Sequence, residues 1–484
     1  MDFSIQDVMQ SSGVKFGTSG ARGLATEMTD LVCYIYTCGF LSYLEQSGEL
    51  KKCGEKVAVA GDLRPSTQRI MTAVARAARD KGYTVVNCGY IPSPAVALYG
   101  IENHCPAIMV TGSHIPSDRN GIKFNKCSGE ILKSDEAGIT AQRVTIPDGK
   151  LDTPYMLPPE DTTARKAYVA RYHSVFPSNC LQGKKIGIYQ HSAVGRHLLV
   201  DIFAGLGATV TALGYSDTFI PVDTEAIREE DAVLARGWSK QHGFDAILST
   251  DGDSDRPLIS DENGEWLRGD IAGILAARYL GADSVSTPVS CNSALEKTGW
   301  FADVRRTKIG SPFVIASMMD AAKQNRRGVI GYEANGGFLT QTGFPLFGKI
   351  LQALPTRDAV LPSLSILLLS IQEKMPISGL VAALPQRFTA SDRIQNFPTE
   401  ESSKILARFE SISEIETVFA AAFGRVDSID RTDGLRVTFK NLEVLHMRPS
   451  GNAPEFRCYN EASDPVRVIE MQKQSMDILL RLKG

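Results

Sequence analysis

Three aspartates spaced two residues apart, Asp251, Asp253 and Asp255, follow directly on the apolar residues 244–250. The apolar run is typical of a buried strand, so the aspartates are expected in the loop at its end. A turn beginning at Gly252 would fold the alternate carboxylates inward onto one hard cation, and oxygen ligands favour Mg²⁺ over softer metals. Chemistry on a phosphate group is the natural use of such a site.

Three other interpretations of this loop remain open. The simplest is an exposed acidic turn that binds nothing. In a calcium-binding EF-hand, Glu262 would stand at the twelfth position, but Arg256 and Pro257 occupy the places of the tight-turning glycine and its successor. In an aspartyl-nucleophile phosphatase, Asp251 would itself carry the phosphoryl group.

Ser113 is a second candidate nucleophile. It lies in a Thr-Gly-Ser-His-Ile-Pro segment that follows the apolar residues 107–110, and this places it in a loop at the carboxyl end of a strand, where open α/β sheets bind ligands. A serine hydroxyl is a weak nucleophile until a base takes its proton or a cation stabilises its oxyanion. His114 and Lys123 are nearby candidates for that task. Alone, the segment is also typical of a polar turn.

Three further segments carry groups that bind phosphates or hydroxyls. Residues 14–23 combine closely spaced glycines with Arg22, whose planar guanidinium suits phosphate. Residues 331–337 end a strand with Glu333 and Asn335, a pair suited to sugar hydroxyls. Residues 446–459 could form a phosphate cradle from Arg448, Ser450, Gly451, Asn452 and Arg457. Each segment alone is also typical of an ordinary turn.

The elements that must position these groups follow a strand–helix–strand pattern that returns three times. The expected ranges are 56–60, 66–80 and 83–87; 185–189, 194–204 and 209–213; and 285–291, a helix to about 300, and 304–307. Ser66 is the expected N-cap of its helix. Strands 256–260 and 265–267 flank a hairpin turn, and Asp270 is expected to cap a helix that ends before Gly281.

The C-terminal segment has a different pattern. Strands are expected near 435–439, 443–447 and 455–460, followed by a helix from about Asp464 with Pro465 at its first position. This indicates an α+β domain after three similar α/β domains with mixed sheets. The predicted domains are 1–160, 161–267, 268–374 and 375–484, arranged around a central cleft that would gather the five distant loops.

The composition is that of a large enzyme with several cores. The chain has 484 residues, 43% of them hydrophobic and 22% charged, which is too long for one core. A formal net charge of -3 gives no broad attraction for nucleic acid.

Its location is predicted to be the cytoplasm. Nine cysteines without a spacing pattern favour reduced thiols there. The N-terminus does not read as a secretory signal. The most apolar stretch, Leu361–Ile371, is too short to span a membrane and is expected to be a buried helix.

Taken together and in this order, the five segments resemble the α-D-phosphohexomutase family, and most nearly its bacterial phosphomannomutase/phosphoglucomutase branch. The resemblance covers the chain from Phe16 to Tyr459. Its most specific parts are the Thr-x-Ser-His-x-Pro loop, the Asn-Gly-x-Lys that follows it, and the Asp-Gly-Asp-x-Asp-Arg loop.

The resemblance implies a role for each segment. Ser113 would be the phosphoserine and, with Asp251, Asp253 and Asp255, would bind Mg²⁺. Arg22, Lys123 and His114 would lie at the transferring phosphoryl group, with Lys123 the preferred acid/base. The residues implied in substrate binding are Glu333, Asn335, Arg256, Thr307, Gly310, Arg448, Ser450, Gly451, Asn452 and Arg457.

The chain departs from the family pattern at several positions. Gly112 and Ile115 stand where the family often has Ala and Asn, and neither change removes a reacting group. The segment that would read the sugar, residues 333–337 and called the sugar loop below, usually has the family sequence Glu-x-Ser-Gly-His. In this chain it ends with Gly337. Any acid–base role of that histidine must therefore pass to another group. The frequent Gly-Thr-Glu-Pro is here Gly-Asn-Ala-Pro, which puts sugar specificity in doubt.

The resulting hypothesis is a phosphosugar mutase that interconverts hexose 6-phosphate and hexose 1-phosphate, most nearly for mannose. It would work through phosphorylated Ser113, a hexose 1,6-bisphosphate that also serves as primer, and Mg²⁺. Alternatives are a phosphoglucomutase, an amino-sugar phosphomutase, the aspartyl-nucleophile phosphatase and a non-catalytic sugar-phosphate sensor. The expected partners are small sugar phosphates, with no nucleic acid and no membrane, and the chain is expected to be a monomer or weak homodimer.

Overall fold

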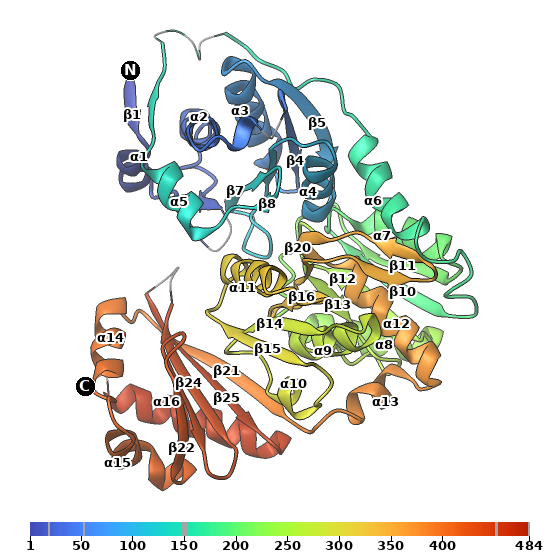
Figure 1. Ribbon diagram of the computed structural model, residues 1–484, viewed down its shortest axis with the longest axis vertical. Helices are drawn as coiled ribbons and strands as arrows, with labels where there is room; N and C mark the ends of the chain where they lie inside the picture. Colours follow the sequence, from blue (N-terminus) through green and yellow to red (C-terminus); the bar gives the residue numbers. More distant parts are fainter. Residues whose placement is uncertain are drawn as a thin grey trace. The chain divides into compact units, whose positions relative to one another are not determined.

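The computed structural model describes residues 1–17, 20–51, 54–147, 149, 151, 153–450 and 454–482 (Figure 1). The chain forms two units, Met1–Val285 with Gly310–Leu380, and Ser286–Ile309 with Val381–Gly484. Among the described helices, none combines the length and the apolar character needed to cross a membrane.

The first sheet of the first unit has the strand order β2-β3-β7-β6-β4-β5, with β8 paired to β7. Strand β4 runs parallel to β5 and β6, whereas β7 is antiparallel to β6 and β3. The strands are β2 (Lys15–Phe16), β3 (Ala21–Leu24), β4 (Lys56–Gly61), β5 (Thr84–Tyr90), β6 (Ala107–Val110), β7 (Arg119–Lys126) and β8 (Gly129–Glu130).

Helices cover both faces of this sheet because its buried strands are apolar on both sides. Val57 and Val59 of β4 join one core with helices α2 and α3, while α4 packs against β4 and β6. Ala58 and Ala60, which alternate with the valines, are also fully buried. The elements around the sheet are α1 (Ile5–Ser12), α2 (Asp30–Gln46), a 3₁₀ turn (Glu49–Lys51), α3 (Thr67–Asp80), α4 (Ser93–Glu102), α5 (Lys133–Thr140) and the paired β1 (Asp2–Ser4) and β9 (Arg143–Thr145).

The second sheet has the order β11-β10-β12-β13. Strand β10 is parallel to β11 and β12, and β13 returns antiparallel to β12. The aspartate loop is therefore the short connection between β12 and β13. The elements are α6 (Thr163–His173), β10 (Lys185–His191), α7 (Arg196–Gly205), β11 (Thr209–Tyr215), α8 (Glu229–His242), β12 (Ala246–Thr250) and β13 (Pro257–Ile259).

The rest of the first unit contains strands β16, β17 and β20, in that order and antiparallel. Helices α9 and α12 pack together, and most of α12 is buried, as predicted for Leu361–Ile371. The elements are α9 (Gly269–Leu280), α11 (Ser311–Lys323), β16 (Val329–Tyr332), β17 (Phe338–Thr340), the hairpin β18 (Phe344–Leu346) and β19 (Lys349–Leu351), β20 (Leu354–Asp358), α12 (Val360–Glu373) and α13 (Ile377–Ala382).

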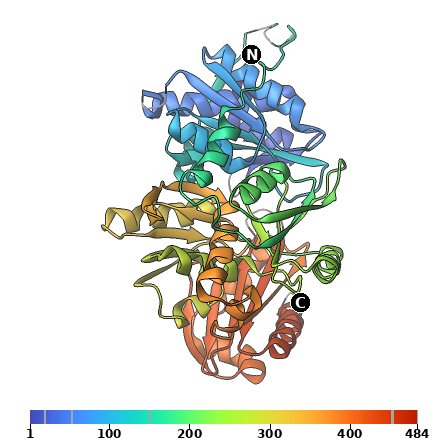
Figure 2. The same cartoon turned by 90° about the vertical axis from the view of Figure 1, so that its right-hand side faces the viewer.

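The second unit is built on an antiparallel sheet of order β21-β25-β24-β23-β22. Helix α16 packs along β21 and β25, as Figures 1 and 2 show. The elements are β14 (Ser284–Pro288), α10 (Ala294–Lys297), β15 (Asp303–Thr307), β21 (Phe388–Gln395), α14 (Thr399–Ala407), α15 (Ile412–Phe423), β22 (Val426–Asp430), β23 (Leu435–Phe439), β24 (Val444–Pro449), β25 (Glu455–Ala462) and α16 (Pro465–Leu482).

The mixed α/β class predicted from the sequence is confirmed, and four local predictions need correction in part or in full. Ser66 is the N-cap residue of α3, as predicted, but it makes no side-chain cap bond, and its hydroxyl accepts from Asn120 instead. Helix α9 has Arg268 as N-cap, so Asp270 lies inside the first turn.

The third correction concerns residues 285–300. Strand β14 ends at Pro288, where the Cys291 amide donates back to the Pro288 carbonyl, and the following helix is only the short α10. The fourth concerns the cysteines. Those that the structure shows as free are residues 33, 38, 88, 105, 180, 291 and 458, but Cys127 is disulfide-bonded, so the expectation of reduced thiols is wrong there.

Candidate active site

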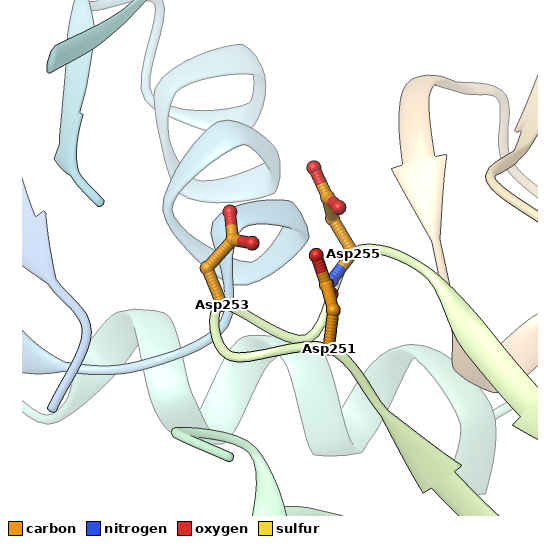
Figure 3. A group of neighbouring side chains, drawn as sticks. All are labelled: Asp251, Asp253 and Asp255. Carbon is orange, nitrogen blue, oxygen red and sulfur yellow. The ribbon is translucent and has the colours of Figure 1, made fainter. Parts of the chain in front are cut away.

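The aspartate loop forms a compact group of three buried carboxylates. One oxygen from each of Asp251, Asp253 and Asp255 lies within 4.8 Å of the others, and Figure 3 shows the three side chains rising from the loop between β12 and β13. Gly252 is required at the turn because a Cβ there would lie 2.8 Å from the Ser113 carbonyl oxygen. Ser254 completes the turn in the left-handed region, with φ +57°.

Hydrogen bonds leave two carboxylate oxygens of this group free. The Oδ2 atoms of Asp253 and Asp255 each accept from Lys123 Nζ at 2.5 Å, and Asp253 Oδ2 also accepts from the Ser93 hydroxyl. The Oδ1 atoms of both residues are buried without a hydrogen-bond partner. Buried oxygens of this kind need a partner, and hard oxygen ligands suit Mg²⁺. The residues therefore fit a bound divalent cation.

The three carboxyl groups differ in their electrostatic setting. Burial and repulsion from its two neighbours raise the pKa of Asp251 well above its usual range. Burial would also raise the pKa of Asp253, but Lys123 and the Ser93 hydroxyl outweigh it and lower that pKa. Arg357 and Lys123 lower the pKa of Asp255 against the same burial. The positive groups thus hold two of the three carboxyls ionised.

Ser113 contacts the aspartate loop directly. Its Oγ donates to Asp251 Oδ2 at 2.5 Å, and its backbone lies in the left-handed region at φ +56°. The amide of Ser113 donates to Thr111 Oγ1 at 2.7 Å, which fixes the turn. A non-glycine residue in this region is strained, and such strain is common at active sites. The predicted proximity of Ser113 to the aspartates is observed.

Arg64 holds the serine loop, although no sequence motif pointed to it. Its guanidinium donates to the backbone carbonyl oxygens of Ser113 at 2.7 Å and of Ile115 and Pro116 at 2.6 Å, and pairs with buried Asp62 at 3.1 Å. It also explains Gly112, because a Cβ at 112 would lie 2.7 Å from Arg64 Cζ. The feature of the sequence that could have pointed to Arg64 is the Asp-Leu-Arg segment directly after buried strand β4.

Arg256 and His114 form a second contact between the two loops. Arg256 Nη1 lies 2.8 Å from His114 Nδ1, and that nitrogen is 3.4 Å from Ser113 Oγ. Burial and the nearby Arg256 lower the pKa of His114 to about 3. The imidazole is therefore neutral at physiological pH and accepts a hydrogen bond from Arg256.

Arg22, on β3, belongs to the same electrostatic group. Burial, together with repulsion from Arg256 and Arg357, lowers its pKa to about 10, so it keeps its positive charge at neutral pH. The site thus combines several cations with the three carboxylates, which is the environment that a transferred phosphoryl group requires.

Glu333 and Asn335 lie in the turn between β16 and β17, as predicted for the sugar loop. Asn335 Oδ1 accepts from the Gly337 amide at 2.9 Å and the Glu333 amide donates to the Gly337 carbonyl at 3.0 Å, which closes the turn. Glu333 Oε2 lies 3.5 Å from Arg357 Nη1. Burial raises the pKa of Glu333. Arg357, which no sequence motif singled out, therefore links this loop to Asp255.

Gly310 lies beside α11 in the first unit, where it is the N-cap residue at φ 128°. Thr307, at the end of β15, belongs to the second unit, and its hydroxyl donates to the Lys308 carbonyl at 2.8 Å.

The expected phosphate cradle also lies on the second unit. Arg448 and Arg457 stand opposite each other on β24 and β25, and the next strand places Arg393 opposite Arg457. Arg448 pairs with Asp433 at 3.3 Å and Arg457 with Glu455 at 3.2 Å. The Ser450 amide donates to the Glu455 carbonyl at 2.8 Å. Gly451 and Asn452 lie outside the described residues.

Similarity to known proteins covers nearly the whole chain. Two models of the phosphoglucomutase/phosphomannomutase family match, alpha/beta/alpha domain I over residues 13–147 and alpha/beta/alpha domain III over residues 268–388. Proteins named phosphomannomutase from Salmonella muenchen and Sinorhizobium fredii are 44% and 43% identical, over 97% and 96% of this chain and 96% and 99% of theirs.

Solved structures share the fold. A phosphoglucomutase/phosphomannomutase family protein from Burkholderia thailandensis superposes with a TM-score of 0.74 at 19% identity, covering 96% of this chain and 97% of that one. N-acetylphosphoglucosamine mutase from Aspergillus fumigatus, in complex with GlcNAc-6P and magnesium, gives 0.59 at 12% identity over the full length of both chains. With relatives 44% identical over almost their entire length, this chain belongs to the phosphoglucomutase/phosphomannomutase family.

Proposed function

We propose that this protein is a phosphomannomutase that interconverts mannose 6-phosphate and mannose 1-phosphate through phosphorylated Ser113 and a hexose 1,6-bisphosphate. The observation that carries the proposal is the 2.5 Å contact between Ser113 Oγ and Asp251 in a carboxylate group that has two buried oxygens without a hydrogen bond. Support for mannose as the sugar comes from the relatives named phosphomannomutase at 43–44% identity. Relatives named phosphoglucosamine mutase are less similar, at 27% for that from Symbiobacterium thermophilum.

The residues of the first unit would divide the work as follows. Ser113 would carry the phosphoryl group, and Asp251, Asp253 and Asp255 would hold Mg²⁺, which would neutralise charge on the serine and phosphoryl oxygens. Arg22, Arg256 and Lys123 would stabilise the negative charge of the transferred group. Lys123 remains our candidate acid/base, and His114 would accept from Arg256 and orient it. Glu333 and Asn335 would read the sugar hydroxyls.

The second unit would bind the phosphate that is not being transferred. Arg448, Ser450 and Arg457, with Gly451 and Asn452, would supply its cradle. Thr307 of the same unit and Gly310 of the first unit would add substrate contacts. We also propose the four-domain division at about residues 160, 267 and 374. The protein would act in the cytoplasm as a monomer or weak homodimer, on small sugar phosphates, with a hexose 1,6-bisphosphate as primer.

The proposal is tested by comparing kcat/KM for mannose 1-phosphate, glucose 1-phosphate and glucosamine 1-phosphate, with Mg²⁺ and a trace of glucose 1,6-bisphosphate. A preference for mannose is expected. Higher activity on glucose or glucosamine would reassign the sugar. Release of inorganic phosphate without isomerisation would instead favour the phosphatase with Asp251 as nucleophile.

The phosphoryl carrier is tested separately with Ser113→Ala and, as a matched control, Ser117→Ala, which changes an exposed serine of the same loop. Ser113→Ala is expected to abolish turnover while keeping sugar-phosphate binding, because only the nucleophile is lost. Ser117→Ala should retain activity. An acid-stable phosphate on Ser113, located by mass spectrometry of the purified protein, is the expected direct observation; normal turnover by Ser113→Ala would refute the assignment.

A further inference from the structure

Arg357 is the largest fully buried side chain of the structure, with 1% of its surface exposed, and it joins two loops of the site. Its Nε and Nη2 atoms each lie 3.0 Å from Asp255 Oδ2. Its Nη1 atom lies 3.5 Å from Glu333 Oε2. A planar guanidinium can contact two carboxylates in fixed directions, which a lysine ammonium cannot do in the same way. The side chain therefore connects the aspartate loop with the sugar loop.

The neighbours of Arg357 along β20 are anchored to other parts of the first unit. Thr356 Oγ1 donates to Glu130 Oε1 at 2.7 Å, and the other oxygen of Glu130 accepts from Ser311 Oγ at 3.0 Å. Asp358 accepts from Tyr168 Oη at 2.8 Å and also from the Tyr172 hydroxyl. These two anchored residues, one on each side, hold the backbone of Arg357 in place, so its guanidinium is preorganised.

The contact with Asp255 determines which oxygen of that residue faces a cation. Asp255 Oδ2 accepts from both Lys123 and Arg357, whereas Asp255 Oδ1 is buried without a hydrogen bond. With Oδ2 fully engaged, Oδ1 is the oxygen left to coordinate a metal. Groups that hydrogen-bond a metal ligand commonly fix its orientation in this way.

Position 337 in the sugar loop requires a glycine because the Arg357 side chain packs against its backbone. A Cβ added at 337 would lie 2.5 Å from Arg357 Cδ and 2.7 Å from Cγ. No side chain fits at 337 unless the arginine moves. This is the position where the sequence resemblance leads one to expect a histidine, so here a cation reaches the sugar loop from a different strand.

We propose that Arg357 is a positioning residue that orients Asp255 for the metal and holds Glu333 for the sugar, and that Gly337 provides the space for its side chain. The inference rests on the proposed function, because it assigns Arg357 a role in the site of that reaction. It predicts that one side chain affects metal binding and sugar-phosphate binding together.

The test uses the full-length protein and four variants, Arg357→Met, Arg357→Lys, Gly337→Ala and the control Arg171→Met. Arg171 is also a buried arginine of the first unit, and it donates to the Gln352 carbonyl at 2.9 Å. Mn²⁺ affinity is measured by calorimetry, and KM and kcat are measured with mannose 1-phosphate. Thermal unfolding shows which variants fold.

Lys123 still offsets the charge of Asp255 in this variant, so Arg357→Met removes mainly the orientation of that carboxylate. It is expected to weaken Mn²⁺ binding by about 10- to 100-fold, as is usual when a partner of a metal ligand is lost. Arg357→Lys is expected to restore most of the Mn²⁺ affinity but not the KM, because one ammonium replaces the charge at Asp255 without also reaching Glu333. Gly337→Ala should raise KM through displacement of Arg357. Arg171→Met should leave Mn²⁺ affinity and KM unchanged even where it lowers thermal stability.

Wild-type Mn²⁺ affinity and wild-type KM in a folded Arg357→Met protein would overturn the inference. If Arg357→Met does not fold, the test rests on Arg357→Lys, and an unchanged KM for Arg357→Lys would also overturn the inference. Comparing Gly337→Ala, a further variant Arg357→Ala and the double variant adds a check, since two changes that disrupt one contact should not be additive. If the wild-type protein isomerises no hexose phosphate, the proposed function fails, while the Mn²⁺ affinities still decide whether Arg357 orients Asp255.

Discussion

Lys123→Met should destabilise the metal-free protein far more than the protein with Mg²⁺. Lys123 Nζ lies 2.5 Å from both Asp253 and Asp255, and the lysine is 7% exposed. Methionine keeps much of the length of the side chain but removes the charge. Two ionised carboxylates then lose a common partner inside the protein, where an unpaired charge is most costly.

The expected cost follows from this burial. Removing one partner of a buried ion pair lowers stability by about 3–5 kcal/mol. For a domain of 150–250 residues, each kcal/mol changes Tm by about 2–4 °C, so the metal-free variant should melt roughly 6–20 °C below the wild type. Mg²⁺ at about 100 times its Kd contributes about 2.7 kcal/mol of stabilisation. The wild type gains the same amount at the same saturation, so the difference shrinks only if the variant binds Mg²⁺ more tightly. This is expected because Lys123 no longer offsets the charge of the carboxylates, and a Kd lowered about 100-fold would remove about 2.7 kcal/mol, roughly half or more of the difference.

The assay is calorimetric unfolding of both proteins in EDTA and in saturating MgCl₂, with Lys126→Met as the control. Lys126 lies on the same strand and pairs at 3.0 Å with one carboxylate, Asp135, outside the aspartate loop. Its replacement should cost less, and the cost should not depend on Mg²⁺. In turnover, Lys123→Met should lose about 10²- to 10⁴-fold in kcat if the lysine is the acid/base. An equal Tm shift with and without Mg²⁺, or one no larger than for Lys126→Met, would refute the reasoning.

Three further outcomes are expected. Arg457→Ala should raise KM for mannose 1-phosphate by about 10- to 100-fold with little change in kcat. The reason is that a charge-assisted hydrogen bond, used in both the ground state and the transition state, contributes about 1.5–3 kcal/mol. An unchanged KM would show that Arg457 is not part of the phosphate cradle. Exhaustive chelation should stop turnover and Mg²⁺ should restore it, whereas full activity after chelation would contradict a metal role for the aspartate loop. Burial lowers the pKa of His191 to about 4 in the folded protein. Between about pH 4 and 6.5 the unfolded state therefore binds more protons than the folded state. The free energy of unfolding should fall by about 1.4 kcal/mol for each pH unit as pH falls through that range. His191→Asn should reduce this slope in urea unfolding measured at pH 6 and pH 5, and an identical slope would show that His191 does not contribute to it.

Local sequence patterns predicted the two loops that meet at the site. Residues 107–110 and 246–250 are apolar runs that end in polar residues, and both form buried strands, β6 and β12. Strand ends and turns depend on neighbouring residues, so the local pattern alone is enough to assign Ser113 and the aspartates to loops. The hairpin turn at 261–264 was predictable for the same reason, and Gly264 adopts φ +84° there.

Other predictions hold only in part, or fail, where tertiary contacts outweigh local preference. Ser66 is the N-cap residue of α3 as predicted, but its hydroxyl makes no cap bond and accepts from Asn120, 54 positions away in the chain. The helix expected up to residue 300 is limited to Ala294–Lys297. There Ser293 donates from its amide and its hydroxyl to Glu461, on β25, so a distant strand holds the start of the helix.

The sequence by itself determined which groups can do the chemistry: a serine, three aspartates, a lysine and the arginines near them. The tertiary structure alone decided how they are oriented, because the groups that orient them come from distant strands. Arg64 reaches the Ser113 loop from 49 positions away, and Arg357 reaches Asp255 from 102 positions away. Neither lies in a motif with these partners, since contacts between residues so far apart in the chain are specified by the packing of strands and not by local spacing.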